Sequence, residues 1–435
     1  MKLSTFQFAV LAFFILFTIA GVVAFAVFGR GANNTSVGPV TIWGTVDGQT
    51  MDTLITTLSS QNKIFQNVTY VQLDPTTYSA TLINALASGN SPDLFLVTQD
   101  TVSSFANKLS PIPYNAVSQA SYLSSFIDEG QLFLTPQGSL ALPFMIDPLV
   151  MYWNRDLFAS AGIAQPPSHW SDFLSLTPKI TSIDAQSNVA RSAVALGEWQ
   201  NITDAKMILS ALFMQAGDPI VTRAQNGALQ SVFGATPSGA VSNPAASVLL
   251  FYTEFANPSK TTYSWNRSLP QSRNDFAAGN LAVYFGLASD DPVLTQSNPN
   301  LSFGVAELPQ IQNNPTQLTF GELTGIAISR IAGNPQGALA VAEALSAPAA
   351  QQQLAAETNL PSVRRSPLTD TSGNATETVF AQSALIAHGW LDPDPASTDL
   401  LFQGMIESIL SGNQEPAGAA SAASQQMAQL VNPQQ

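Results

Sequence analysis

Tryptophans beside short polar loops are the residues of this chain best suited to hold a small polar solute. Trp43 ends a predicted strand, Val40–Trp43, and the loop Gly44–Gln49 follows it. In an open α/β sheet, the loops after the carboxyl ends of the strands face the ligand crevice. An exposed Trp43 could stack on the C–H face of a sugar, while Asp47 or Gln49 hydrogen-bonds its hydroxyls. The alternative is that Trp43 packs on the surface of its own domain.

Polar side chains follow other strands as well. Gln99 and Asp100 come directly after the predicted strand Leu94–Thr98, at the same sheet edge as the Trp43 loop. Asp100 could also cap a helix that begins near Val102. Asp147 precedes a proline, so it is either a ligand contact or a turn residue.

Further aromatic residues are candidates for lining a cleft. Tyr152 and Trp153 are neighbours in a predicted strand, and we expect one of them, not both, to point inward because side chains alternate along a strand. Trp199 lies in an irregular polar stretch, and Trp265 precedes a predicted helix.

Catalytic and metal-binding patterns are missing from the sequence. The two histidines, His169 and His388, are far apart and lack metal-ligand spacing. The chain contains no Gly-x-Ser-x-Gly, Walker or dinucleotide-binding motif. We therefore expect no cofactor, metal or catalytic residue. A carboxylate pair for glycoside hydrolysis stays open, because its partners can be distant in the chain.

Composition narrows the possible partners. The net charge is −14, and only 10% of residues are charged, against about 25% in an average protein. Such a surface offers no field for phosphates, which argues against nucleic acid as a partner. The 45% hydrophobic content suffices for large cores, and without cysteine the fold has no disulfide and no lipidated N-terminal cysteine.

The elements that would position these residues alternate between strands and helices. Strands at Val40–Trp43, Val68–Leu73 and Leu94–Val97 are separated by helical patterns at Met51–Leu58 and Tyr78–Leu86. This alternation predicts βαβ units and a parallel sheet. The pattern resumes with the strand Leu149–Trp153, a helix opened by Pro166-Pro167-Ser168 and a helix after Asn334-Pro335. We expect the tail after Gly412 to be a weak helix or a frayed end.

The N-terminus carries a long apolar segment. Phe6–Phe28, about 23 residues without a charge, is long enough to span a bilayer as a helix. We expect residues 1–30 to form an uncleaved anchor with residues 31–38 as a linker, and the charge bias places the rest of the chain outside the cell. Ala24-Phe25-Ala26 leaves signal-peptide cleavage as the alternative.

Four segments together resemble the extracellular solute-binding proteins of ABC importers, of the maltose and sugar-binding type. These segments run in family order, namely Ala85–Phe95, Leu142–Trp170, Asp275–Pro309 and Gly321–Pro361. The second is the most specific, with Tyr152-Trp153-Asn154-Arg155-Asp156 followed by Gly162 and Pro166-Pro167. One departure is that no aromatic residue follows Gly286.

The resemblance implies a two-lobed α/β fold with a ligand cleft between the lobes. Lobe I would comprise residues 39–142 and 287–320, and lobe II residues 146–283 and 324–435. The crossings would lie near Pro143, Gly286 and Glu322. Asp290 and Glu322, close to two of these crossings, complete the candidate ligand contacts, although Asp290 beside a proline also fits a turn.

The resemblance favours a membrane-anchored receptor that captures a small solute and delivers it to ABC permease subunits. A carbohydrate is the solute that it favours most. We expect the receptor to be a monomer. Two alternatives stay open, an anchored enzyme that acts on polysaccharide and a sensor or adhesion module on the same fold.

Overall fold

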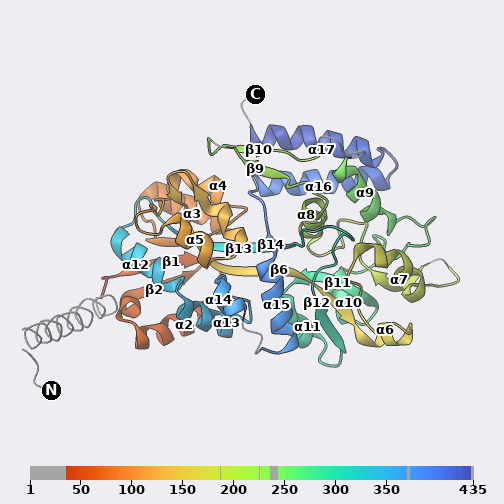
Figure 1. Ribbon diagram of the computed structural model, residues 1–435, viewed down its shortest axis with the longest axis horizontal. Helices are drawn as coiled ribbons and strands as arrows, with labels where there is room; N and C mark the ends of the chain where they lie inside the picture. The colour runs from red at the N-terminus through yellow and green to blue at the C-terminus, as the bar shows by residue number, and fades with distance from the viewer. Residues whose placement is uncertain (1–35, 187, 225, 236–242, 370–372, 433–435) are drawn as a thin grey trace, which may run out of the picture. The chain divides into compact units, whose positions relative to one another are not determined.

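The computed structural model describes residues 36–432, apart from residues 187, 225, 236–242 and 370–372 (Figure 1). The predicted anchor and most of the predicted linker lie outside the described residues. Within the described part of the chain, no helix is long and apolar enough to cross a bilayer. The described residues form two compact units, one comprising residues up to Leu94 together with Ile331–Ala344 and the other comprising Phe95–Arg330 and Leu345–Gln435.

Unit 1 contains the alternation that the sequence predicts. Its elements are β1 (Val40–Gly44), α2 (Gly48–Gln61), the 3₁₀ helix η1 (Lys63–Asn67), β2 (Val68–Gln72), α3 (Tyr78–Ser88) and all but the last residue of α12 (Pro335–Leu345). β1 and β2 pair in parallel, as a βαβ unit requires. Gly89 ends α3 in the left-handed conformation, with φ of 78°, which suits a residue without a Cβ.

Unit 2 is built on a mixed sheet. Its main strands are β3 (Leu94–Thr98, whose first residue belongs to unit 1), β6 (Leu142–Asn154), β7 (Ser182–Ile183), β8 (Val189–Val194), β11 (Leu281–Leu287), β12 (Phe303–Ala306), β13 (Thr319–Ile328) and β14 (Ala387–His388). The strand order is β3-β13-β6-β11-β8-β7, with β12 on β6 and β14 on β13. β6 runs antiparallel to β13, β11 and β12, so this sheet is not purely parallel.

Most helices of unit 2 are short. They are α4 (Val102–Phe105), α5 (Gln119–Ser125), α6 (Arg155–Ser160), α7 (Phe173–Ile180), α8 (Ala205–Gln215), α9 (Pro244–Glu254), α10 (Ser272–Ala277), α11 (Asp290–Ser297), α13 (Pro348–Thr358), α14 (Arg365–Leu368), α15 (Ala375–Leu385), α16 (Pro395–Leu410) and α17 (Pro416–Val431). The remaining elements are the 3₁₀ helices η2 (Ala106–Lys108), η3 (Asp128–Phe133) and η4 (Trp170–Asp172) and the two-stranded ribbons β4 (Leu134–Thr135) with β5 (Gly138–Ser139) and β9 (Val221–Arg223) with β10 (Leu229–Ser231).

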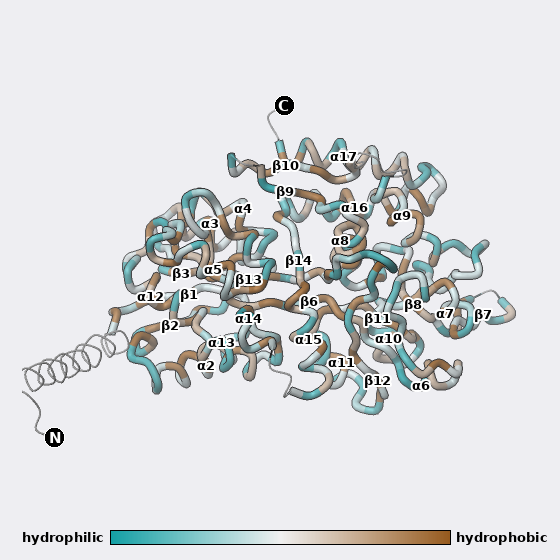
Figure 2. The backbone as a smooth tube through the Cα atoms, in the orientation of Figure 1, coloured by the Kyte–Doolittle hydropathy of each residue, from teal (hydrophilic) through white to brown (hydrophobic). Residues whose placement is uncertain are grey.

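Strand β6 changes partners along its length. Its first part pairs with β13, from Leu142 opposite Ile326 to Pro148 opposite Gly321. Its second part pairs with β11, beginning at Leu149. The tube of β6 is mostly brown in Figure 2, because apolar residues predominate along the strand. The sequence predicts only the second part as strand, since Pro143 and Pro148 read as interruptions.

Local predictions of element ends are confirmed in some places and corrected in others. Asn154 caps α6, because its side chain accepts hydrogen bonds from the backbone N–H of Asp156 and Leu157. The helix expected after Pro166-Pro167-Ser168 begins later, as η4 at Trp170, and Trp170 is buried as core. The tail is a regular helix rather than a frayed end, because Ala419, Ala420, Ala423 and Met427 are buried (α17, Figure 1).

The two compact units do not coincide with the expected lobes. Residues 95–142 and 287–320, expected in lobe I, belong to unit 2. Within that range, β12 pairs with residues 151–154 of β6, which were expected in lobe II. The lobe bounds stay a prediction.

Candidate functional site

Unit 2 contains a cavity of about 370 Å³ whose wall combines indole rings with carboxylates. We call it the Trp199 cavity. Its principal lining residues come from separate parts of the unit, namely Asp100, Trp199, Asp204, Lys206, Phe320 and Trp390. A wall of this kind can stack on an apolar face of a solute and accept hydrogen bonds from its polar groups.

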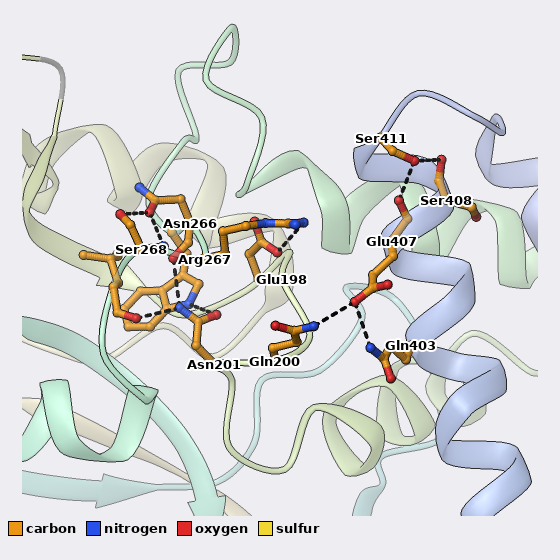
Figure 3. A network of polar contacts seen from close by, with 12 residues as sticks. Glu198, Gln200, Asn201, Asn266, Arg267, Ser268, Gln403, Glu407, Ser408 and Ser411 are labelled. Atoms are coloured by element: carbon orange, nitrogen blue, oxygen red, sulfur yellow. Dashed lines mark hydrogen bonds and ion pairs between the residues drawn. The ribbon is translucent and has the colours of Figure 1, made fainter.

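Trp199 lies in the loop between β8 and α8, and its neighbours Glu198, Gln200 and Asn201 belong to a polar network (Figure 3). The Asn201 side-chain amide donates to the backbone oxygens of Asn266 at 2.9 Å and Leu269 at 3.0 Å. The Trp265 indole N–H donates in turn to the Asn201 side-chain oxygen at 3.1 Å. These bonds anchor the loop two residues beyond Trp199.

A second set of contacts ties the same loop to α16. The Gln200 side-chain amide donates to Glu407 at 3.2 Å, and Gln403 donates to the same carboxylate oxygen at 2.8 Å (Figure 3). Arg267 forms an ion pair with Glu198 at 3.3 Å, and this pair is exposed on the arginine side. The residues on both sides of Trp199 are therefore restrained in position.

Trp390 and Lys206 form the opposite part of the wall. The Trp390 indole N–H donates to the Ser210 hydroxyl at 3.1 Å. Lys206 Nζ lies 5.6 Å from the centre of the Trp390 ring and 2.7 Å from an Asp392 carboxylate oxygen. Because the Asp392 side chain is fully buried, this lysine has a fixed place and a compensated charge.

Two carboxylates of the cavity wall have raised pKa values. Burial raises the pKa of Asp100 to about 6, with a further contribution from the charge of Asp392. Burial likewise raises the pKa of Asp204 to about 7, helped by the charge of Asp290. Asp204 precedes α8 with φ of 58°, a left-handed conformation unusual for a residue other than glycine. Both groups therefore gain from a partner that compensates negative charge.

Behind these residues, two carboxylates face each other across neighbouring strands. Glu322 on β13 is the direct cross-strand partner of Asp147 on β6. Burial raises the pKa of Glu322 to about 7, and the charges of Asp100, Asp147 and Asp204 add to this. Burial also raises the pKa of Asp147 to about 6, although the Ser289 backbone N–H donates to its carboxylate at 3.1 Å. Like charges directly opposite each other destabilise a sheet.

Glu129 on η3 is a deeply buried acid of this region. It is 2% exposed, and neither of its carboxylate oxygens has a hydrogen-bond partner among the described residues. Burial raises its pKa well above the usual range, and the charges of Asp100 and Glu322 act in the same direction. Its oxygens lie against Gly321 and Gly389, where any Cβ would collide with them.

Several predicted contact residues already have protein partners. Gln99 is fully buried, and its side chain bonds the backbone of Gly321 and Leu323. Asp290 is bound by Arg273 at 2.8 Å and by the Tyr284 hydroxyl at 2.5 Å. These bonds make Gln99 and Asp290 structural elements of the site.

Of the predicted aromatic contacts, some are buried with protein partners and others are partly exposed. Tyr152 is fully buried, with its hydroxyl donating to the Leu287 oxygen at 2.7 Å, whereas Trp153 is half-buried beside Arg155. Neither residue lines the Trp199 cavity, and a ligand role for one of them stays a prediction. Trp265 is fully buried and holds Asn201, so we leave it out of the proposed site.

The predicted contacts of unit 1 cluster around the end of β1. Trp43 is half-buried, whereas Asp47 and Gln49 are exposed. Asp47 caps α2 by accepting a hydrogen bond from the Thr50 backbone N–H at 2.9 Å. A ligand role for these three residues stays a prediction.

Sequence reasoning missed Asp204, Lys206 and Phe320 as cavity residues. Asp204 lies just before a helix, where an aspartate is read as a cap, and its left-handed backbone is not visible in the sequence. The alternative of a helix cap at Asp100 is not realised, because Thr101 precedes α4. Among the described residues, no group of three histidine or acidic side chains is placed to hold a metal ion.

The fold is shared with solved solute-binding proteins. The cyclic α-maltosyl-1,6-maltose binding protein of Arthrobacter globiformis matches with a TM-score of 0.74 at 18% identity, over 91% of this chain and all of that one. The solute-binding protein of Thermotoga lettingae bound to α-D-tagatose has a TM-score of 0.66 at 19% identity, over 91% of this chain and 100% of that one. The GacH receptor of Streptomyces glaucescens, solved with acarbose, gives 0.67 at 16% identity, over 92% of this chain and 99% of its own. These likenesses show the two-lobed α/β fold.

A sequence search among curated proteins finds no match. The model of the family described as bacterial extracellular solute-binding protein matches residues 43–352, which is most of the chain. The chain belongs to the bacterial extracellular solute-binding proteins.

Proposed function

We propose that this protein is a membrane-anchored extracellular receptor that captures a carbohydrate and delivers it to the permease of an ABC importer. The observation that carries the proposal is the Trp199 cavity, in which two indoles and three carboxylates line one space in a member of a solute-binding family. The half-buried Trp199 offers an apolar face for the C–H face of a sugar ring. Asp100 and Asp204 are acceptors for hydroxyl groups.

A binding panel tests this proposal. Full-length protein in detergent is heated with neutral and charged sugars, oligosaccharides, polyols, polyamines and peptides. A solute at 100 times its Kd stabilises the folded protein by about 2.7 kcal/mol, which gives a clear rise in Tm. The same solute should lose affinity in Trp199→Ala. A panel in which only peptides or polyols raise the Tm contradicts a carbohydrate ligand.

The anchor is tested separately. An intact Phe6–Phe28 segment keeps the protein in the membrane fraction with Met1 at its N-terminus. A mature protein that is soluble and begins near Val27 contradicts the anchor and supports signal cleavage.

An enzyme on polysaccharide is the rival function, and the raised pKa values of Asp100 and Glu322 are the specific feature that favours it. We infer binding without catalysis, because the chain belongs to a family of binding proteins. Incubation with the best-bound oligosaccharide, followed by product analysis, separates the two, since a receptor returns its ligand unchanged.

A further inference from the structure

The charged side chains that line the Trp199 cavity are mostly acidic. Among the described residues that line it, Asp100, Asp204 and Asp399 are acidic and Lys206 is the one cation. Lys206 is already paired with Asp392 at 2.7 Å. Arg273, whose charge acts on Asp204, is paired with Asp290 at 2.8 Å. The nearby cations are therefore committed to other carboxylates.

Asp100 and Asp204 of the cavity wall, and Glu322 outside it, have no equivalent protein partners. Within the part of the chain that the structure describes, no donor contacts the carboxylates of Asp100, Asp204 or Glu322 within hydrogen-bond distance. Glu322 faces Asp147 across the sheet, and the charge of Asp100 acts on Glu322. Carboxylates gathered in this way repel one another when they are ionised, and without a bound cation this repulsion is not compensated.

Glu129 is an independent observation that points the same way. Its carboxylate is 2% exposed and has no hydrogen-bond partner among the described residues, and its oxygens lie against Gly321, the residue before Glu322. Buried polar groups without partners are rare and call for an explanation. Glu129 does not line the Trp199 cavity, but the charge of Asp100, which does line it, acts with burial to raise the pKa of Glu129.

We propose that the solute of the Trp199 cavity is a carbohydrate that carries a free, protonated amine. An ammonium near Asp100 and Asp204 compensates the excess negative charge, and the indole face of the half-buried Trp199 attracts cations as well as sugar C–H groups. A neutral sugar would instead remove water from the same carboxylates and leave their repulsion in place. This inference rests on the proposed function and specifies the class of carbohydrate.

The pH dependence of binding follows from the same groups. The titratable and charged groups around the site come from every neighbouring element, namely Asp100, Glu129, Asp147, Asp204, Lys206, Arg273, Asp290, Glu322, Asp392 and Asp399. Because burial raises the pKa of Asp100 to about 6 and that of Asp204 to about 7, both acids gain charge between pH 5 and pH 7.5. Affinity for an ammonium should rise over this range, and binding should release protons.

The experiment compares two ligands that share the same sugar skeleton and differ only in whether the amine is free or acetylated. Full-length protein in detergent is titrated calorimetrically with the 2-aminoethyl glycoside of maltotriose, a trisaccharide whose alkyl amine stays protonated from pH 5 to pH 7.5, and with its N-acetylated counterpart. At pH 7 we expect the free amine form to bind at least 10-fold more tightly, and at pH 5 we expect this preference to shrink. Asp100→Asn and Asp204→Asn should each reduce the preference, whereas the exposed Asp156→Asn should not.

The outcomes separate this inference from the proposed function. Equal or tighter binding of the N-acetylated trisaccharide overturns the amine, and so does a preference that is the same at pH 5 and pH 7. If neutral maltotriose or mannobiose binds best, the amine is wrong and the carbohydrate receptor stands. If no sugar binds with or without an amine, or if only spermidine binds, both proposals fail.

Discussion

Replacing Glu322 with glutamine should stabilise the unliganded protein at high pH and leave it unchanged at low pH. Burial and the neighbouring acids raise the pKa of this carboxyl from 4.5 to about 7 in the folded protein. A raised pKa means that the folded state holds the proton more tightly than the unfolded state does. The contribution to stability is therefore complete below pH 4.5 and is lost progressively as the pH rises to about 7.

The size of the effect follows from the pKa difference. At about 1.4 kcal/mol for each pH unit between the two states, full ionisation of Glu322 would cost about 3 kcal/mol. Asp100 and Asp147 share the same repulsion, and the side chain is only half-buried, so we expect about 1–2 kcal/mol. Glutamine has the same shape and cannot ionise, and it avoids this cost.

Denaturant unfolding at pH 4.5 and pH 8 measures the difference. Wild type and Glu322→Gln should be equally stable at pH 4.5, and the variant should be more stable at pH 8. The exposed Glu415→Gln is the matched control and should follow wild type at both values. Parallel pH profiles of wild type and Glu322→Gln would refute the account of a repulsive carboxylate pair.

Three further substitutions test the supports of the site. Lys206→Met should destabilise the protein by about 3 kcal/mol in urea unfolding, because it leaves the buried Asp392 without its cation; a loss below about 1 kcal/mol would argue against a structural ion pair. Trp265→Phe should cost about 1–2 kcal/mol, because Asn201 loses the indole donor, and a protein as stable as wild type would show that the loop is held by its other bonds. Trp43→Ala should weaken solute binding by roughly 1–3 kcal/mol in calorimetry with little change in Tm; an unchanged Kd with a lower Tm would make Trp43 a packing residue.

The sequence predicts local structure well where one signal decides it. Alternating strand and helix patterns locate β1, α2, β2 and α3, and glycine at position 89 ends the last of these helices as expected. Asn154 is predicted as a cap and is one, because capping depends only on the next few residues.

The site is less predictable, because it depends on pairing between distant segments. Glu322 is a candidate from the sequence, but its cross-strand partner Asp147 follows only from the register of β13 on β6. Trp199 and Trp265 occur in similar polar surroundings in the sequence, yet one lines the cavity and the other is fully buried. The left-handed backbone at Asp204 is set by tertiary packing, which no local pattern reports.

A crystal structure of the protein with its most tightly bound solute tests the central claim most directly. We predict that the solute lies against the indole of Trp199, with a polar group within hydrogen-bond distance of Asp100. A solute bound elsewhere, with the Trp199 cavity still filled by water, would contradict the assignment of this cavity as the binding site.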